Sequence, residues 1–235
     1  MKTEKEEGKI ELILGPMFSG KSTRLIEIIR KSVYQAKKSI IVNLFTNKRY
    51  SEKSEVVTHD LIKYDSIDCK QLSDYIDILK KYDVIGIDEG QSFPDLIEIC
   101  EELALLKKTV IVIALNGDFR MKPFPIISRL ISKCDKIKLL KAYCFYCHKD
   151  AKFTLLFDQF NEKVLNGVGE AYKPACRECH VFFSKEREKG NFNINKIKRK
   201  ENEENKEIKI SLKIKGEKEL SSSSTDTSSS PNKKK

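Results

Sequence analysis

Short apolar runs alternate with segments of helical period along the first 141 residues of the chain, and polar turns separate them. The strand-like runs lie at 10–14, 39–45, 83–87, 109–115 and 136–141. The segments with apolar residues at helical spacing lie at 23–36, 71–81, 94–106 and 126–132. This alternation predicts an α/β fold, in which a mostly parallel sheet has helices on both faces and binds ligands outside the carboxyl ends of its strands.

The turn between the first predicted strand and helix has the sequence of a phosphate-binding loop. Gly15, Gly20, Lys21 and Ser22 fit the pattern G-x-x-x-x-G-K-[ST]. In this pattern backbone N–H groups wrap a phosphate, the lysine reaches the β- and γ-phosphates, and the hydroxyl meets Mg²⁺. A glycine turn without a ligand is the alternative, but a strand before the loop and a helix after it are the context that a phosphate site requires. The pattern therefore predicts a P-loop NTPase-like site for a nucleoside triphosphate.

An acidic pair follows the strand predicted at 83–87. Asp88 stands at the carboxyl end of this strand, where a carboxylate helps to hold Mg²⁺ beside the loop phosphates. Glu89 is then free to take the proton of an attacking hydroxyl. The alternative is a pair that only caps the helix predicted at 94–106.

Four of the seven cysteines form two C-x₂-C pairs with 28 residues between them, more than the 15 to 20 usual in zinc ribbons, and four unrelated buried or oxidised cysteines are the alternative. Four thiolates in a tetrahedral arrangement give a closed structural zinc site, in a small zinc-ribbon-like domain. The predicted ligands are Cys144, Cys147, Cys176 and Cys179. Cys69, Cys100 and Cys134 are expected to be ordinary buried thiols. Between the pairs, Phe153–Thr154 and 157–160 suggest a small hairpin.

The two ends of the chain differ from the rest in composition. Residues 1–8 are charged and predict a flexible leader, and residues 184–235 are rich in Lys, Glu, Asn and Ser, which predicts disorder. That tail holds 15 Lys/Arg and 9 Asp/Glu, so it contributes +6 of the net charge of +10. The remaining part is only mildly basic, and no nucleic-acid partner is expected.

Without a signal peptide or an apolar run of membrane length, a cytoplasmic protein is expected. The predicted domains are a P-loop ATP-binding α/β domain at 9–141 and a zinc-binding domain at 142–183.

In this combination of motifs the chain resembles the thymidine kinase 1 family, the type II deoxynucleoside kinases, over residues 10–183. The resemblance is carried by the loop 15–23, Arg49–Tyr50, 87–91, Phe119, 122–124, both cysteine pairs and Tyr172. It implies transfer of the ATP γ-phosphoryl group to the 5′-hydroxyl of thymidine, giving dTMP for DNA precursor synthesis by nucleotide salvage. Deoxyuridine is a second candidate substrate.

The resemblance also implies roles for individual residues. Glu89 would be the general base, and Arg49 would stabilise charge on the transferring group. Contacts to ATP and Mg²⁺ would come from Gly15, Met17, Phe18, Ser19, Gly20, Lys21, Ser22, Thr23, Asp88 and Gln91. The nucleoside pocket would be lined by Met17, Leu115, Phe119, Phe124, Thr154, Val164, Asn166, Gly167, Val168, Gly169 and Tyr172. In the family, residues matching 164–172 form a lasso that closes over the nucleoside, and zinc anchors it. Members are commonly homotetramers inhibited by dTTP, and both properties are expected here.

Three positions depart from the family pattern. Asn47 stands where an Asp is usual, Ser92 where an aromatic residue usually faces the base, and Leu156 where a basic residue is common. These departures leave open a degenerate kinase kept as a binding or regulatory protein. A separate alternative is a zinc-bearing P-loop ATPase that acts on nucleic acid, with the basic tail as a tether. In the tail, Lys200-Glu201-Asn202 resembles a degradation signal that vertebrate members of the family carry. Because the tail is made largely of Lys, Glu and Asn, chance is the stronger explanation for this tripeptide.

Overall fold

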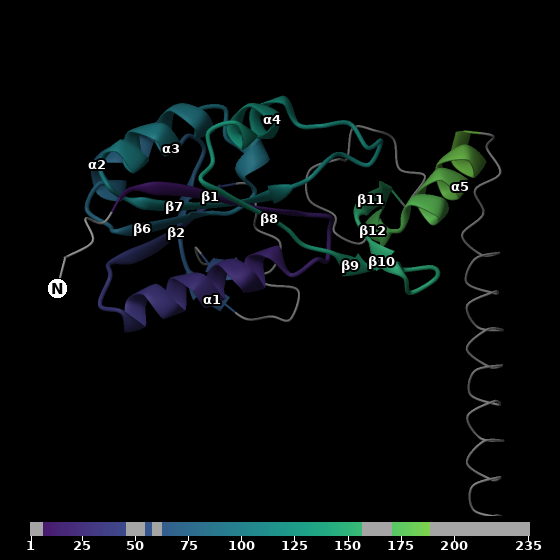
Figure 1. Ribbon diagram of the computed structural model, residues 1–235, viewed down its shortest axis with the longest axis horizontal. Helices are drawn as coiled ribbons and strands as arrows, with labels where there is room; N and C mark the ends of the chain where they lie inside the picture. The colour runs from purple at the N-terminus through teal and green to yellow at the C-terminus, as the bar shows by residue number, and fades with distance from the viewer. Residues whose placement is uncertain (1–6, 46–54, 58–62, 157–170, 189–235) are drawn as a thin grey trace, which may run out of the picture. The chain divides into compact units, whose positions relative to one another are not determined.

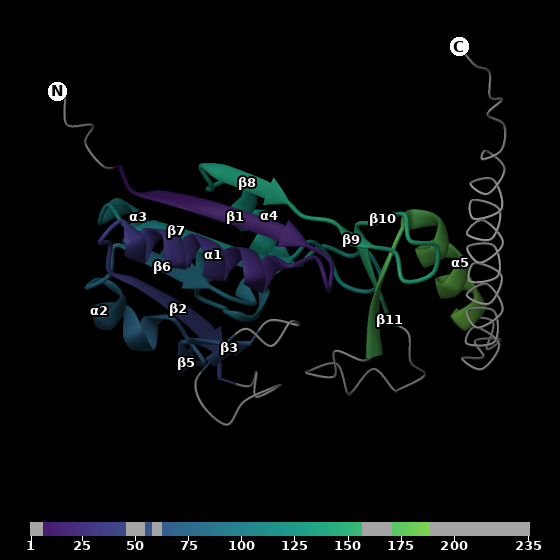
Figure 2. The same ribbon diagram turned by 90° about the horizontal axis from the view of Figure 1, so that it is seen from below.

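The centre of the protein is a six-stranded sheet in the order β5-β2-β6-β7-β1-β8, and every neighbouring pair of strands is parallel (Figure 1 and, for β5, Figure 2). The structure is a computed structural model that describes residues 7–45, 55–57, 63–156 and 171–188. The six strands are β1 (Lys9–Gly15), β2 (Ser39–Leu44), β5 (Ile67–Cys69), β6 (Val84–Ile87), β7 (Thr109–Leu115) and β8 (Lys136–Leu139). The predicted α/β fold with a mostly parallel sheet is confirmed.

Helices cover both faces of the sheet because its strands are apolar on both sides. Helix α1 lies on one face, and α2, α3 and α4 lie on the other (Figure 1). The helices are α1 (Lys21–Tyr34), α2 (Ile76–Leu79), α3 (Leu96–Leu105) and α4 (Pro125–Ile131). In β7, Ile111 and Ile113 pack with α1, whereas Val110 and Val112 pack in the core of the other face. Two hydrophobic layers therefore hold the sheet rigid beneath the loops at the carboxyl ends of its strands.

One glycine of the sheet is required by the close approach of α1. A Cβ atom at Gly86 in β6 would lie 2.8 Å from Leu25 Cδ1 on α1. Both residues are buried, so a larger side chain would push α1 away from the sheet. This packing keeps the end of β6 next to the start of α1.

The predicted elements agree with the structure in position, with three differences in the α/β part. The helix predicted at 71–81 is a 3₁₀ turn, Ser73–Tyr75, followed by the four-residue α2. Strand β5 was not predicted, because a three-residue strand carries little periodicity. A short antiparallel pair, β3 (Glu55–Val57) with β4 (Lys63–Asp65), lies beyond the main sheet.

The cysteine-bearing part consists of two short antiparallel pairs and a helix (Figure 2). These are β9 (Ala142–Tyr143) with β10 (Asp150–Ala151), β11 (Phe153–Leu156) with β12 (Tyr172–Ala175), and α5 (Arg177–Glu188). Strand β11 pairs with β12, a pairing that the sequence did not predict. The other half of the expected hairpin, 157–160, lies outside the described residues. Helix α5 was not predicted, and it continues past the boundary expected at residue 183. Among the described residues, no helix is long and apolar enough to cross a membrane.

Candidate functional site

The loop between β1 and α1 has the strand–loop–helix form that the sequence predicted. Gly20 precedes α1 with φ 77°, and Phe18 also has a positive φ, 63°. At Gly15 a Cβ atom would lie 2.4 Å from Ser19 Oγ, so only glycine fits at this point of the loop. Ser19 Oγ donates a hydrogen bond to Pro16 O at 2.9 Å. The loop is therefore a tight backbone cradle at the amino end of a helix, which is the geometry of a phosphate site.

Lys21 and Ser22 begin α1 and direct their polar groups to the loop and to β6. Lys21 is buried, and its Nζ donates to Pro16 O at 2.8 Å. Ser22 Oγ donates to Asp88 Oδ2 at 3.0 Å. Thr23, in the same first turn, is half-buried. The structure thus brings together Ser22 and Asp88, the hydroxyl and carboxylate that the sequence assigned to Mg²⁺.

Asp88 is a buried carboxylate, with only 7% of the residue exposed. Its Oδ1 accepts a hydrogen bond from Glu89 N at 2.7 Å. Burial and the charge of Glu89 raise the pKa of Asp88 to about 6, although the hydrogen bond from Ser22 and the charge of Lys21 act in the opposite direction. Asp88 does not cap α3, whose N-cap residue is Asp95. The carboxylate faces the phosphate loop, so the capping alternative fails for Asp88.

We expect Asp88→Asn to stabilise the protein in the absence of nucleotide at neutral pH. The folded-state pKa lies above the unfolded value, so the contribution of Asp88 to stability is full below about pH 4 and is lost as the pH rises through about 6. Removing the charge should raise the free energy of unfolding by about 1–3 kcal/mol at pH 7.5, and the gain should shrink towards pH 4. Urea unfolding at several pH values measures this. An Asn variant that is less stable than wild type at pH 7.5 would contradict the argument.

Glu89 is held by Gln91, which follows it in a short 3₁₀ turn. Glu89 has φ 52°, and its Oε2 accepts a hydrogen bond from Gln91 Nε2. Gln91 Oε1 in turn accepts from Leu115 N, at the end of β7, at 3.2 Å. The resemblance to the family places Gln91 among the ATP contacts. In the structure its amide nitrogen contacts Glu89 and its amide oxygen contacts the backbone of β7, so Gln91 connects Glu89 to the sheet. The Glu89 carboxylate is therefore fixed relative to the sheet.

Of the residues expected at the nucleoside, the structure brings two pairs together. Thr154, which is buried on β11, accepts a hydrogen bond from Met17 N of the phosphate loop at 3.0 Å. The rings of Phe119 and Tyr172 lie 6.4 Å apart between centroids. Phe124 is partly buried and packs against the hydrophobic core that includes α3 and α4. Arg49, Val164, Asn166, Gly167, Val168 and Gly169 lie outside the described residues.

Two of the three positions that depart from the family pattern are described. Ser92 is exposed at the end of the turn that carries Gln91. Leu156 is buried, with 6% exposed, at the end of β11. A charged side chain would be costly in that position, so the leucine fits its surroundings here. Asn47 lies outside the described residues.

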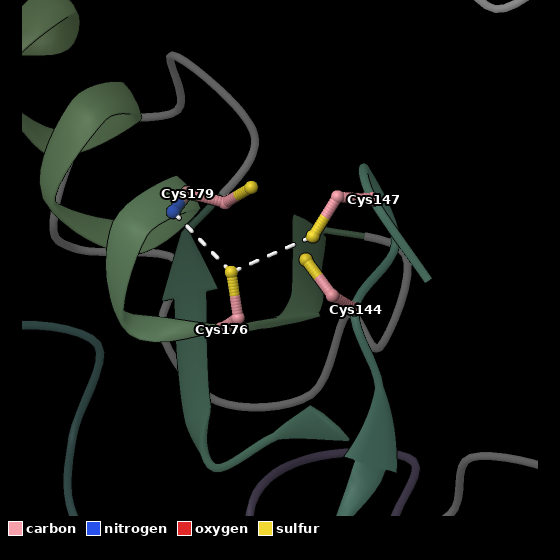
Figure 3. Close-up of side chains that lie close together, drawn as sticks. All are labelled: Cys144, Cys147, Cys176 and Cys179. Carbon is pink, nitrogen blue, oxygen red and sulfur yellow. Dashed lines mark hydrogen bonds between the residues drawn. The ribbon is translucent and has the colours of Figure 1, made fainter. Parts of the chain in front are cut away.

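The four predicted zinc ligands converge in the cysteine-bearing part (Figure 3). Their sulfur atoms all lie within 4.8 Å of one another, and Cys147 Sγ and Cys176 Sγ are 3.6 Å apart. A tetrahedral zinc with Zn–S bonds of about 2.3 Å requires sulfur atoms about 3.8 Å apart. Burial would raise the pKa of Cys144, but backbone N–H groups of Cys176, Cys147 and Tyr146 directed at its sulfur lower it to about 7, whereas burial and the neighbouring thiols raise the pKa of Cys147 and Cys179. The donor set fits a structural zinc ion.

The other three cysteines lie outside the cluster, and two of them are buried as expected. All are free thiols; Cys69 and Cys100 are buried and Cys134 is half-buried. Burial raises the pKa of Cys69 to about 12 and that of Cys134 to about 11. They are therefore protonated near neutral pH and are poor metal ligands.

Two contacts between the sheet and the cysteine-bearing part were not predicted. Asn116 Nδ2 donates to Lys152 O at 2.9 Å, and His180 Nε2 lies 2.9 Å from Phe119 O. A single polar residue in a loop or helix gives no sequence signal for such a contact. Together with Thr154, these residues connect the cysteine-bearing part to loops at the carboxyl ends of β1 and β7.

Comparison with known proteins agrees with this geometry. The family model for thymidine kinase matches residues 8–180. The chain is 40% identical over 187 residues to thymidine kinase 1 of Dictyostelium discoideum, covering 78% of this chain and 81% of that protein. It is 39% identical over 175 residues to the thymidine kinase of Myxoma virus (strain Uriarra) and 38% identical over 174 residues to that of Vaccinia virus (strain Ankara), covering 74% of this chain and 97% of each viral protein. The chain therefore belongs to the thymidine kinase family.

Proposed function

We propose that the protein transfers the γ-phosphoryl group of ATP to the 5′-hydroxyl of thymidine, giving dTMP and ADP. The observation that carries the proposal is the arrangement of Ser22, Asp88 and Glu89 beside the phosphate loop, in a chain of the thymidine kinase family. Deoxyuridine, which lacks only the 5-methyl group of thymidine, is proposed as a weaker substrate.

The chain supplies the parts that phosphoryl transfer requires. Backbone N–H groups of the loop from Gly15 to Thr23 bind the phosphates, and Lys21 leaves Pro16 O to contact the β- and γ-phosphates. Ser22 and Asp88 would hold Mg²⁺, which would supply positive charge to neutralise the phosphates. Glu89, oriented by Gln91, accepts the proton of the 5′-hydroxyl. The 5′-oxygen of the nucleoside then bonds to the γ-phosphorus, and the bond from that phosphorus to ADP breaks. On the resemblance to the family, Arg49 is proposed to stabilise the negative charge on the phosphoryl group during its transfer.

The nucleoside is proposed to bind where the loops after β1 and β7 meet the cysteine-bearing part. The assigned residues are Met17, Leu115, Phe119, Phe124, Thr154 and Tyr172, with Val164, Asn166, Gly167, Val168 and Gly169 of the lasso. Leu156 pairs with Tyr172 in the β11–β12 ladder, so Tyr172, the last residue of the lasso, is joined to β11. Strand β12 leads directly to Cys176, and a zinc ion on the four cysteines would fix that end.

Further properties are proposed on the resemblance to the family. They are a homotetramer in the cytoplasm, feedback inhibition by dTTP, and an organisation into a leader, an ATP-binding domain, a zinc-binding domain and a tail. Size-exclusion chromatography with light scattering tests the tetramer, and inhibition of turnover by dTTP tests the feedback.

The test of the proposed function is formation of dTMP by the purified, zinc-loaded protein with Mg²⁺ and ATP. Deoxyuridine and deoxycytidine are compared as substrates under the same conditions. Thymidine is expected to have the highest kcat/KM, and turnover should stop when EDTA removes Mg²⁺. Folded, zinc-loaded protein that phosphorylates none of these nucleosides would favour a degenerate kinase, and Asn47 would then be the first residue to revert to Asp.

A further inference from the structure

His180 is a buried polar residue that the proposed mechanism does not use. It follows Cys179 on α5, and only 4% of it is exposed. Its Nε2 atom lies 2.9 Å from the backbone oxygen of Phe119, in the loop after β7. We propose that His180 is a positioning residue that holds the Phe119 loop in place for the nucleoside, an inference that rests on the proposed thymidine kinase activity.

The chemistry of the contact defines the tautomer of His180. A carbonyl oxygen only accepts hydrogen bonds, so Nε2 carries the hydrogen and donates it to Phe119 O. Nδ1 is then the acceptor, and the hydroxyl of Ser184 lies 3.4 Å away, one helical turn further along α5. Both ring nitrogens therefore have partners of the matching kind.

The Phe119 loop is closed on itself but needs an outside contact to define its place. Asp118 N donates to Lys122 O at 2.9 Å, and Asp118 Oδ1 accepts from Lys122 N at 2.7 Å. These bonds fix the shape of the turn and leave the Phe119 carbonyl directed at α5. Because that carbonyl is the atom that His180 contacts, the hydrogen bond joins the backbone of the turn to α5.

Helix α5 also contacts the ring of Phe119 and the strand beside it. The guanidinium of Arg187 lies over the Phe119 ring, 5.2 Å from its centroid. The His180 ring packs against the ring of Phe153 at 5.9 Å, next to Thr154 on β11. His180 therefore lies between Phe119 and Thr154, two residues assigned to the nucleoside pocket, and neither contact involves the phosphate loop directly.

The start of α5 carries Cys179, so the cysteine cluster and the Phe119 loop share one helix. A zinc ion that fixes the first turn of α5 would also fix the imidazole. Loss of the donor at position 180 should leave a buried carbonyl unpaired and free the turn to move. The effect should fall on nucleoside binding and spare ATP binding, because the phosphates are held by β1 and α1.

The experiment compares wild type, His180→Phe, His180→Gln and Val181→Ala. His180→Phe keeps an aromatic ring but removes the donor, and should raise the KM for thymidine about tenfold while the KM for ATP and kcat change less than about threefold. His180→Gln restores an N–H donor and should bring the KM for thymidine to within about threefold of wild type. Val181→Ala, at an exposed neighbouring position, should match wild type. Zinc content and Tm are measured for all four proteins.

Several outcomes would overturn the inference. The first is a His180→Phe variant with the wild-type KM for thymidine. The second is an equal rise in the KM values for thymidine and ATP together with loss of zinc. The third is a KM for thymidine in His180→Gln that stays as high as in His180→Phe. The tautomer is checked separately by nitrogen NMR of the wild-type protein, which has three histidines. A ring protonated on Nδ1 alone would remove the proposed bond even if the variants fail to fold. Failure of wild type to phosphorylate thymidine would instead contradict the proposed function, and the NMR result would still test the His180–Phe119 contact.

Discussion

Replacement of Glu89 by glutamine is expected to lower kcat for thymidine by about 10²–10⁴-fold, with little change in ATP binding. Glutamine keeps the size of the side chain and its contact with Gln91, but it cannot take the proton of the 5′-hydroxyl. The phosphate loop and the Ser22–Asp88 pair are not altered by this change. Steady-state kinetics and calorimetric titration with ATP measure the two effects.

Glu98→Gln is a matched control for this variant. Glu98 lies on α3, and its carboxylate is exposed and 3.9 Å from Arg129, which is also exposed. Surface ion pairs of this kind contribute little, so wild-type kinetics are expected. A Glu89→Gln protein whose kcat stays within about threefold of wild type would show that Glu89 is not the general base.

Replacement of Cys176 by serine is expected to release zinc and to destabilise β12 and α5. Cys176 Sγ is 3.6 Å from Cys147 Sγ and accepts a hydrogen bond from Cys179 N, so it contacts both halves of the cluster. A structural zinc ion contributes folding free energy directly, and we expect Tm to fall by about 10 °C or more. The KM for thymidine should rise more than about tenfold, because Tyr172 and the lasso segment adjoin this strand.

Cys134→Ser is the control for the cysteine change. Cys134 is half-buried and outside the cluster, so the zinc content of the Cys134→Ser protein should equal that of wild type. Zinc analysis and thermal unfolding separate the two variants. Full zinc content and an unchanged Tm in Cys176→Ser would contradict the structural role of the cluster.

The sequence was informative where chemistry requires fixed spacing or where burial requires a long apolar run. The phosphate loop, the Asp88–Glu89 pair and the four cysteines follow such patterns, and β7 was predicted with its observed bounds. Short elements such as β5 and α2 were missed or misjudged because three or four residues define no period. The β11–β12 pairing was missed because partners far apart in sequence leave no local signal.

Contacts between parts were the second class of feature that sequence reasoning could not supply. The Gln91 bridge from Glu89 to Leu115 N and the His180 contact with Phe119 O each depend on where two distant backbones meet. Asp88 was predicted as a metal-side carboxylate, but its burial and raised pKa became visible only when β6 was seen in the sheet.

The order of strands in the sheet has a consequence for how the protein is made. The phosphate loop leaves β1, and both neighbours of β1 come later in the chain: β7 pairs with it on one side and β8 on the other. During synthesis from the amino end, β1 therefore has no partner until residue 109 and beyond have left the ribosome. Strands β2 and β6 can pair earlier, whereas the pairing of β1 with β7 joins residues about 100 positions apart, and contacts this distant in sequence form slowly. The nucleotide-binding loop is translated before the other strands of the sheet, but both strands that flank β1 are added after it.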